Sequence, residues 1–156
     1  MEAKGFKVSI PELPKKDSPD LKNWLPAALK EQIDEETILI GHSAGAPLIL
    51  SLLENIQVKV KQAILVAGYA RPKGKNKNPE AILQDKYEWD KIRANVAEII
   101  FINSDNDPWG CDDKEGEYMQ NHLGGMLIIR KGEGHMGSDS FNQPYKEFPL
   151  LVELIK

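Results

Sequence analysis

The sequence predicts an α/β fold, with a mostly parallel sheet and helices on both faces, formed as a single domain over residues 1–156. Short apolar runs rich in branched side chains alternate along the chain with segments whose apolar residues recur at helical spacing. Near-continuous apolar runs are typical of parallel strands covered on both faces. The chain shows no internal repeat and no dividing linker, and 156 residues suffice for one buried core. Alternation of this kind favours layers of helix, sheet and helix.

Five strands are expected. The first, residues 5–10 (GFKVSI), alternates apolar and polar side chains, as a strand with one covered face would. The others are almost entirely apolar, which indicates strands inside the sheet. They are TILI (37–40), QAILVAG (62–68), EIIFIN (98–103) and MLIIR (126–130).

Helices are expected between and after these strands. Ser18 and Pro19 form a reasonable cap and first-turn pair, and apolar residues then recur at helical spacing as far as Ile33. Pro26 is expected to bend this helix. The further predicted helices cover 46–55, roughly 80–96, roughly 112–123 and the end of the chain from 144.

Composition narrows the classes of partner. The formal net charge of −4 supplies no positive field for nucleic acid or an anionic membrane. Cys111 is the single cysteine, which excludes an internal disulfide framework and fits a reducing compartment, so we expect a cytoplasmic protein. The amino-terminal residues do not resemble a signal peptide, and no apolar run reaches the roughly 20 residues of a membrane span. A small-molecule ester or amide is the expected partner, nucleic acid and membranes are not, and a protein partner is left open.

The stretch ILIGHSAGAP places a serine between two glycines, where a strand gives way to a helix. This G-x-S-x-G pattern over residues 41–45 has the strand-turn-helix setting that a nucleophile elbow requires. Gly41 and Gly45 are expected to leave space that Cβ atoms would fill beside Ser43. The helix amino terminus would direct N–H groups toward an oxyanion. The alternative is a tight turn that only permits close packing.

A reactive serine needs a base and a group that orients it. Asp105 and Asp107 follow the strand at 98–103, and His135 follows the strand at 126–130 in a glycine-rich loop. The carboxyl ends of parallel strands lie at one edge of a sheet, so these side chains are expected near Ser43. The order serine, aspartate, histidine is that of hydrolases with this architecture. Asp107 precedes a proline and suits an ordinary turn equally well.

Other residues receive weaker predictions. The side chain of His42 must point away from that of Ser43, and we interpret it as pocket packing. His122 ends a polar helix, where it complements the helix dipole. Tyr69 and Trp109 are candidate pocket walls, or ordinary packing residues.

Neither a cofactor nor a metal is predicted. GEGHMG (132–137) matches a dinucleotide fingerprint, but too little chain follows it for a second strand. DNDPWG (105–110) begins like a calcium loop, yet Gly116 stands where the bidentate glutamate would be required.

The motifs ILIGHSAGAPLIL, INSDNDPWG and KGEGHMG resemble those of small single-domain α/β-hydrolases of the YdeN and retinoblastoma-binding-protein type. The resemblance implies Ser43 as nucleophile, Asp107 as the acid and His135 as general base, with Asp105 as second choice for the acid. It also implies the Ala44 N–H as one oxyanion donor.

The same resemblance implies a minimal, N-terminally shortened member. The group usually begins with another strand and helix, and a His-Gly loop there supplies a second oxyanion N–H. Either that segment precedes Met1, or the sheet closes with residues 5–10 beside residues 37–40.

The predicted function is hydrolysis of small esters or amides through an acyl-enzyme. The segment between residues 68 and 98 is too short for a large lid, which favours a shallow, open pocket. The alternative is a hydrolase remnant with little turnover that binds a protein or a small molecule.

Overall fold

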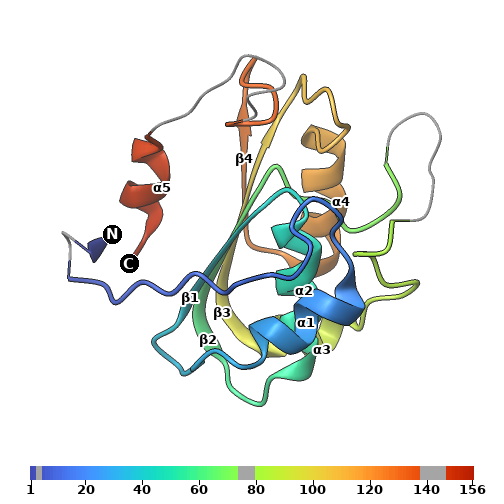
Figure 1. The fold of residues 1–156 in the computed structure, drawn as a ribbon. Helices are drawn as coiled ribbons and strands as arrows, with labels where there is room; N and C mark the ends of the chain where they lie inside the picture. The colour runs from blue at the N-terminus through green and yellow to red at the C-terminus, as the bar shows by residue number, and fades with distance from the viewer. Residues whose placement is uncertain (3–4, 74–79, 138–146) are drawn as a thin grey trace.

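The structure is a computed structural model that describes residues 1–2, 5–73, 80–137 and 147–156 (Figure 1). Four parallel strands form one sheet in the order β1-β2-β3-β4. Each strand lies beside its neighbour in the chain, as right-handed crossover connections allow. The predicted parallel α/β fold is therefore confirmed. The strands are β1 (Ile38–His42), β2 (Val60–Val66), β3 (Val96–Ser104) and β4 (Met126–Arg130).

Helices cover both faces of the sheet, as predicted. In Figure 1, α5 lies on one side of the sheet and α1 to α4 lie on the other. The side-chain amide of Gln62 in β2 donates to the carbonyl of Leu154 in α5, at 2.9 Å, which fixes that helix against its face. The helices are α1 (Leu21–Ala28), α2 (Gly45–Asn55), α3 (Trp89–Ala94), α4 (Asp113–Leu123) and α5 (Pro149–Leu154).

The core lies around the two central strands and α2. In β2, every residue except Lys61 is buried. Leu50 and Leu53 of α2 are fully buried, as are Ile64 and Phe101 from the two central strands. This apolar packing supplies most of the free energy that holds the strand ends in place. No helix among the described residues is long and apolar enough to cross a bilayer.

The predicted strand at residues 5–10 is wrong, because this segment has an irregular conformation. Ile10 is 86% exposed and Val8 is 42% exposed, so the alternating pattern covers no apolar face here. The sheet of the described residues begins at β1, where Ile40 is 41% exposed. Short alternation predicts a strand only when a neighbouring strand is available to pair with it.

The first helix starts and ends differently from the prediction. Asp20, rather than Ser18, is its cap, and its carboxylate accepts from the Lys22 N–H at 2.9 Å. An aspartate satisfies a free N–H of the first turn at least as well as a serine. The helix ends at Ala28 instead of continuing to Ile33, and Pro26 lies inside it.

The helix predicted at roughly 80–96 is reduced to α3. Glu54 of α2 accepts hydrogen bonds from the side chain of Gln84, at 2.8 Å, and from the Glu88 N–H, at 2.5 Å. These contacts hold the preceding segment against α2 as a series of turns. Tertiary hydrogen bonds have overridden a helical pattern of moderate propensity.

Candidate active site

Ser43 lies at the sharp turn between β1 and α2. Its φ of 54° is in the left-handed region, which a residue with a side chain rarely adopts. Its N–H donates to the carbonyl of Val66 in β2 at 2.9 Å, so the turn is fixed to the neighbouring strand. Strain of this kind persists only where surrounding contacts maintain it. Ser43 therefore has the strand-turn-helix setting that was predicted from the sequence.

The two glycines of the elbow have different roles. A Cβ at Gly41 would lie 2.6 Å from the carbonyl oxygen of Gly45 and 2.7 Å from the Ile49 side chain, so glycine is required there. A Cβ at Gly45 would meet nothing within 4 Å. The steric prediction for Gly45 is therefore wrong, because its Cβ would point away from the turn into open space.

Asp107 and His135 form a buried pair at the carboxyl ends of β3 and β4. The His135 Nδ1 and the Asp107 Oδ2 are 2.6 Å apart, and the two side chains are 8% and 0% exposed. Because a carboxylate accepts, Nδ1 is the donor in this bond, and in the tautomer that has its single proton on Nδ1 the Nε2 atom carries a lone pair. The Trp109 N–H donates to the other carboxylate oxygen, Oδ1, at 2.8 Å. The acid is thus oriented at both oxygens.

Asp105 and Asn106 bind the backbone of the loop that carries His135. The Gly132 N–H donates to Asp105 Oδ1 at 2.7 Å, and the Gly134 N–H donates to Asn106 Oδ1 at 2.8 Å. Asp105 is exposed, and it binds the loop instead of the imidazole. Asn106 was missed in the sequence, where an asparagine in an acidic turn has no distinguishing pattern.

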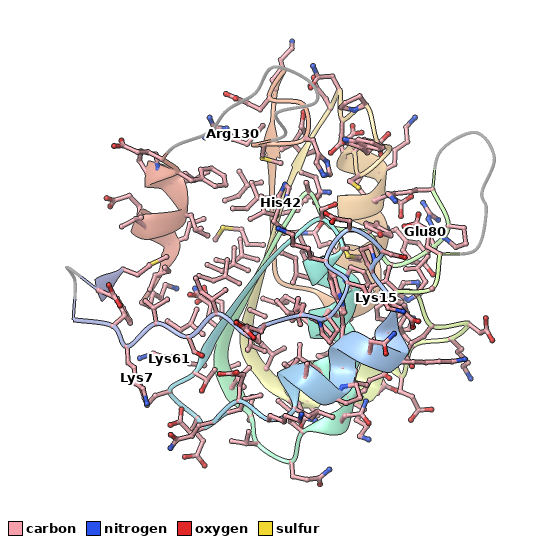
Figure 2. The ribbon with its side chains drawn as sticks, in the orientation of Figure 1. Lys7, Lys15, His42, Lys61, Glu80 and Arg130 are labelled. Carbon is pink, nitrogen blue, oxygen red and sulfur yellow. The ribbon has the colours of Figure 1, made fainter. Side chains whose placement is uncertain are left out.

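His42 connects the elbow to the histidine loop. Its Nε2 lies 2.8 Å from the carbonyl oxygen of His135, so Nε2–H is the donor. The two rings meet edge to face, with centroids 4.8 Å apart. His42 lies near the carboxyl end of the sheet, as Figure 2 shows. His42 keeps exposed surface, but the part of its ring that packs against the His135 loop is desolvated, and this lowers the pKa of His42 below its ordinary value.

The two candidate pocket aromatics differ in their surroundings. Trp109 is 51% exposed, and its ring centroid lies 6.3 Å from that of His135. Tyr69 is 2% exposed, and its hydroxyl donates to Glu80 at 2.6 Å. Trp109 therefore presents an apolar surface beside the histidine, while Tyr69 is part of the interior.

Cys111 lies against the aspartate and histidine pair. One ligand atom from each of Asp107, Cys111 and His135 lies within 4.8 Å of the others, a spacing at which a metal could be considered. Burial raises the pKa of the Cys111 thiol well above its ordinary value, which disfavours the thiolate that a metal requires. The imidazole and carboxylate already bond each other, so the donor set does not fit a metal well.

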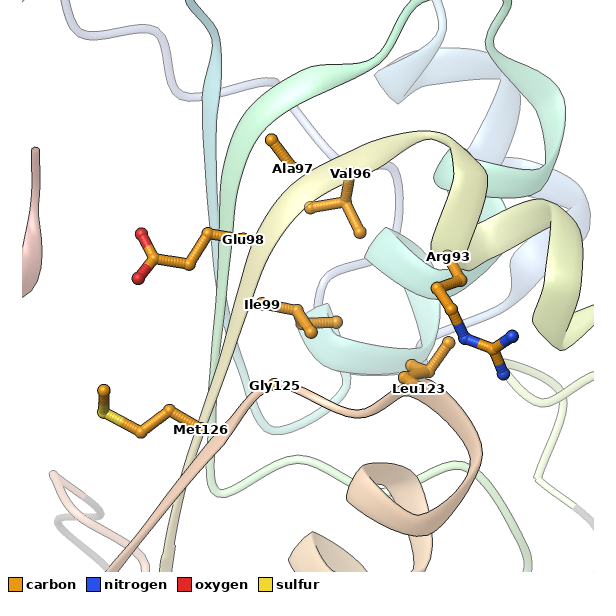
Figure 3. A pocket seen from close by; sticks show the side chains of 8 residues that line it. All are labelled: Arg93, Val96, Ala97, Glu98, Ile99, Leu123, Gly125 and Met126. Atoms are coloured by element: carbon orange, nitrogen blue, oxygen red, sulfur yellow. The ribbon is translucent and has the colours of Figure 1, made fainter.

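A hollow at the opposite edge of the sheet contains none of these groups. Figure 3 shows it at the amino ends of β3 and β4. Its charged side chains form ion pairs with residues outside the hollow: Glu98 pairs with Lys156 at 2.7 Å, and Arg93 pairs with Asp90 at 3.0 Å. Open α/β sheets bind ligands at the carboxyl edge instead, where the Ser43 turn and the Asp107–His135 pair lie.

A strained serine turn after one strand, with an acid and a histidine after two later strands, defines the α/β-hydrolase class. The model of the serine hydrolase family matches residues 4–154 of the chain. The chain belongs to the serine hydrolase family.

Individual relatives agree with this assignment. The chain is 30% identical over 141 residues to the serine hydrolase RBBP9 of Rattus norvegicus, covering 89% of this chain and 74% of the relative. It is 28% identical over 109 residues to YdeN of Bacillus subtilis, covering 67% of this chain and 57% of the relative.

Solved structures show the same fold. The crystal structure of the B. subtilis ydeN gene product matches with a TM-score of 0.87 at 23% identity, covering 98% of this chain and 82% of that one. An esterase from Exiguobacterium antarcticum matches with a TM-score of 0.61 at 14% identity, covering 87% of this chain and 74% of that one.

Proposed function

We propose that this serine hydrolase cleaves small esters or amides through Ser43, His135 and Asp107. The observation that carries the proposal is the 2.6 Å hydrogen bond between the His135 Nδ1 and the Asp107 carboxylate, whose side chains are both buried. His42 joins the loop of His135 to the serine turn. Such a bond holds the imidazole in the tautomer that can accept a proton at Nε2.

In the first half-reaction, the Ser43 hydroxyl oxygen forms a bond to the substrate carbonyl carbon while its proton passes to His135 Nε2. The positive imidazolium is stabilised by the Asp107 carboxylate. Collapse of the tetrahedral intermediate breaks the bond to the leaving group, which takes the proton from Nε2. An acyl ester on Ser43 remains.

In the second half-reaction, water replaces the leaving group. His135 Nε2 accepts a proton from the water as its oxygen attacks the acyl carbon, and returns that proton to the Ser43 oxygen as the acid product departs. The Ala44 N–H, at the start of α2, is the proposed donor to the oxyanion in both steps. The amino-terminal dipole of α2 favours negative charge at the same place.

The proposed substrates are small because the segment that joins β2 to β3 is too short to form a large lid. Trp109 is half exposed and offers one apolar wall. A flat aromatic surface of this kind favours an apolar acyl or alcohol group over a charged one.

Hydrolysis of p-nitrophenyl acetate tests the proposal. We expect turnover by the wild type, loss of turnover in Ser43→Ala and unchanged turnover in Ser9→Ala, which removes an exposed hydroxyl that donates to Glu31 and to no residue of the site. A folded wild type without turnover would contradict the proposal. It would favour the alternative, a binding module that keeps the fold without the reaction.

A further inference from the structure

The main chain of His135 receives a hydrogen bond from the residue that precedes Ser43. The His42 Nε2–H donates to the His135 carbonyl at 2.8 Å, and the edge of one ring meets the face of the other at an interplanar angle of 63°. Ninety-three positions separate the two residues in the chain. The contact therefore joins the serine turn directly to the histidine loop.

The other hydrogen bonds of this loop are made with residues that follow β3, not with the serine turn. Asp105 and Asn106 bind the N–H groups of Gly132 and Gly134, and Asp107 binds the imidazole itself. All three acceptors follow β3, so they fix the histidine relative to the acid. The His42 contact fixes it relative to the elbow.

We propose that His42 is a positioning residue, which holds the His135 main chain so that the imidazole stays aligned with the Ser43 hydroxyl. This inference rests on the proposed function. A displacement of about 1 Å between a base and its nucleophile can cost on the order of 10²-fold in rate, so one hydrogen bond at this point has a large effect on turnover.

The electrostatic setting of His42 suits this role. Partial desolvation lowers the pKa of His42 below its ordinary value of 6.5, although the residue keeps exposed surface, so the neutral ring predominates at pH 7 and has an N–H to donate. A positive charge on His42 would oppose the imidazolium that His135 forms during the reaction. A neutral donor holds the loop without that penalty.

Two substitutions separate the hydrogen bond from the ring. His42→Phe keeps an aromatic ring and removes the donor. His42→Gln removes the ring and keeps a donor, since the amide nitrogen of glutamine is as many bonds from the main chain as the Nε2 of histidine. His122→Phe is the matched control, because the His122 ring stacks on Trp89 with centroids 4.6 Å apart, outside the site.

The measurement is the kcat and KM for p-nitrophenyl acetate, with the thermal midpoint of each variant. We expect His42→Phe to lower kcat about 10- to 100-fold with KM within about twofold, because alignment and not substrate binding is lost. His42→Gln should recover most of kcat, and His122→Phe should match the wild type.

Three outcomes overturn the inference: a folded His42→Phe with wild-type kcat, an equal loss of kcat in Phe and Gln, or a change confined to KM. If His42→Phe does not fold, His42→Ala is measured against His42→Gln with the same expectations. Absence of turnover in the wild type would instead contradict the proposed function, so the two failures are distinguishable.

Discussion

The imidazole of His135 donates to the carboxylate of Asp107 at 2.6 Å, across two loops that follow neighbouring strands. Twenty-eight positions separate the two residues, and both side chains are withdrawn from solvent. The parallel pairing of β3 with β4 brings them together, because both strands end at the same edge of the sheet.

Replacement of this acid should remove most of the turnover. In Asp107→Asn the amide can donate to Nδ1, which favours the wrong tautomer, and we expect kcat to fall about 10³- to 10⁴-fold. The matched variant is Asp105→Asn, which alters the exposed acceptor of the Gly132 N–H and should cost less than about tenfold. Steady-state kinetics of both variants check this. A larger loss in Asp105→Asn would assign the acid to that residue.

The two elbow glycines should respond oppositely to alanine. Gly41→Ala places a Cβ 2.6 Å from the Gly45 carbonyl oxygen, and should lower the free energy of unfolding by about 1–3 kcal/mol. Gly45→Ala meets open space at the start of α2, where alanine favours the helix, and should be neutral or stabilising by up to about 1 kcal/mol. Urea unfolding measures both. Equal losses would show that the turn is constrained at both positions.

Cys111 should make stability fall at alkaline pH. Burial raises the pKa of the folded thiol above its ordinary value of 9.0, so the unfolded chain loses this proton first. The contribution of this thiol to the free energy of unfolding is therefore fully present below pH 9. It is lost as pH rises above that value, by about 1.4 kcal/mol per pH unit for one proton.

The comparison is with Cys111→Ala, which lacks the thiol and should show a shallower decline. The buried tyrosines titrate at higher pH and are present in both proteins. Unfolding free energies of wild type and variant between pH 8 and pH 10 provide the test. Parallel curves would mean that the thiol ionises equally in both states.

The four strands of the sheet could be predicted from the sequence, since their apolar runs reflect burial on both faces. It failed at residues 5–10, where Ile10 faces solvent, because alternation of side chains does not reveal whether a partner strand is present. It also predicted too long a helix before β3, where the Glu54 carboxylate of α2 accepts a hydrogen bond from the Glu88 N–H. Contacts between distant segments leave no local pattern.

In the candidate site too, residues with a local sequence pattern could be predicted and residues that act through distant contacts could not. The sequence could indicate Ser43, Asp107 and His135 as candidates because each follows a predicted strand. In the structure, His135 and Asp107 are hydrogen-bonded to each other. The roles of Asn106 and His42 were not visible, since both act by binding backbone groups of a loop far along the chain. Because nearly every residue has the same main-chain groups, a hydrogen bond to one of them does not require a particular residue type at the partner position.

The most direct test of the account is the site at which a fluorophosphonate probe attaches. In this reaction the activated serine oxygen bonds to phosphorus and fluoride leaves, so peptide mass mapping identifies the nucleophile. We predict a single adduct on Ser43, absent in Ser43→Ala and formed much more slowly in His135→Ala. A folded wild type that carries no adduct, or carries it on another residue, would contradict the proposed triad.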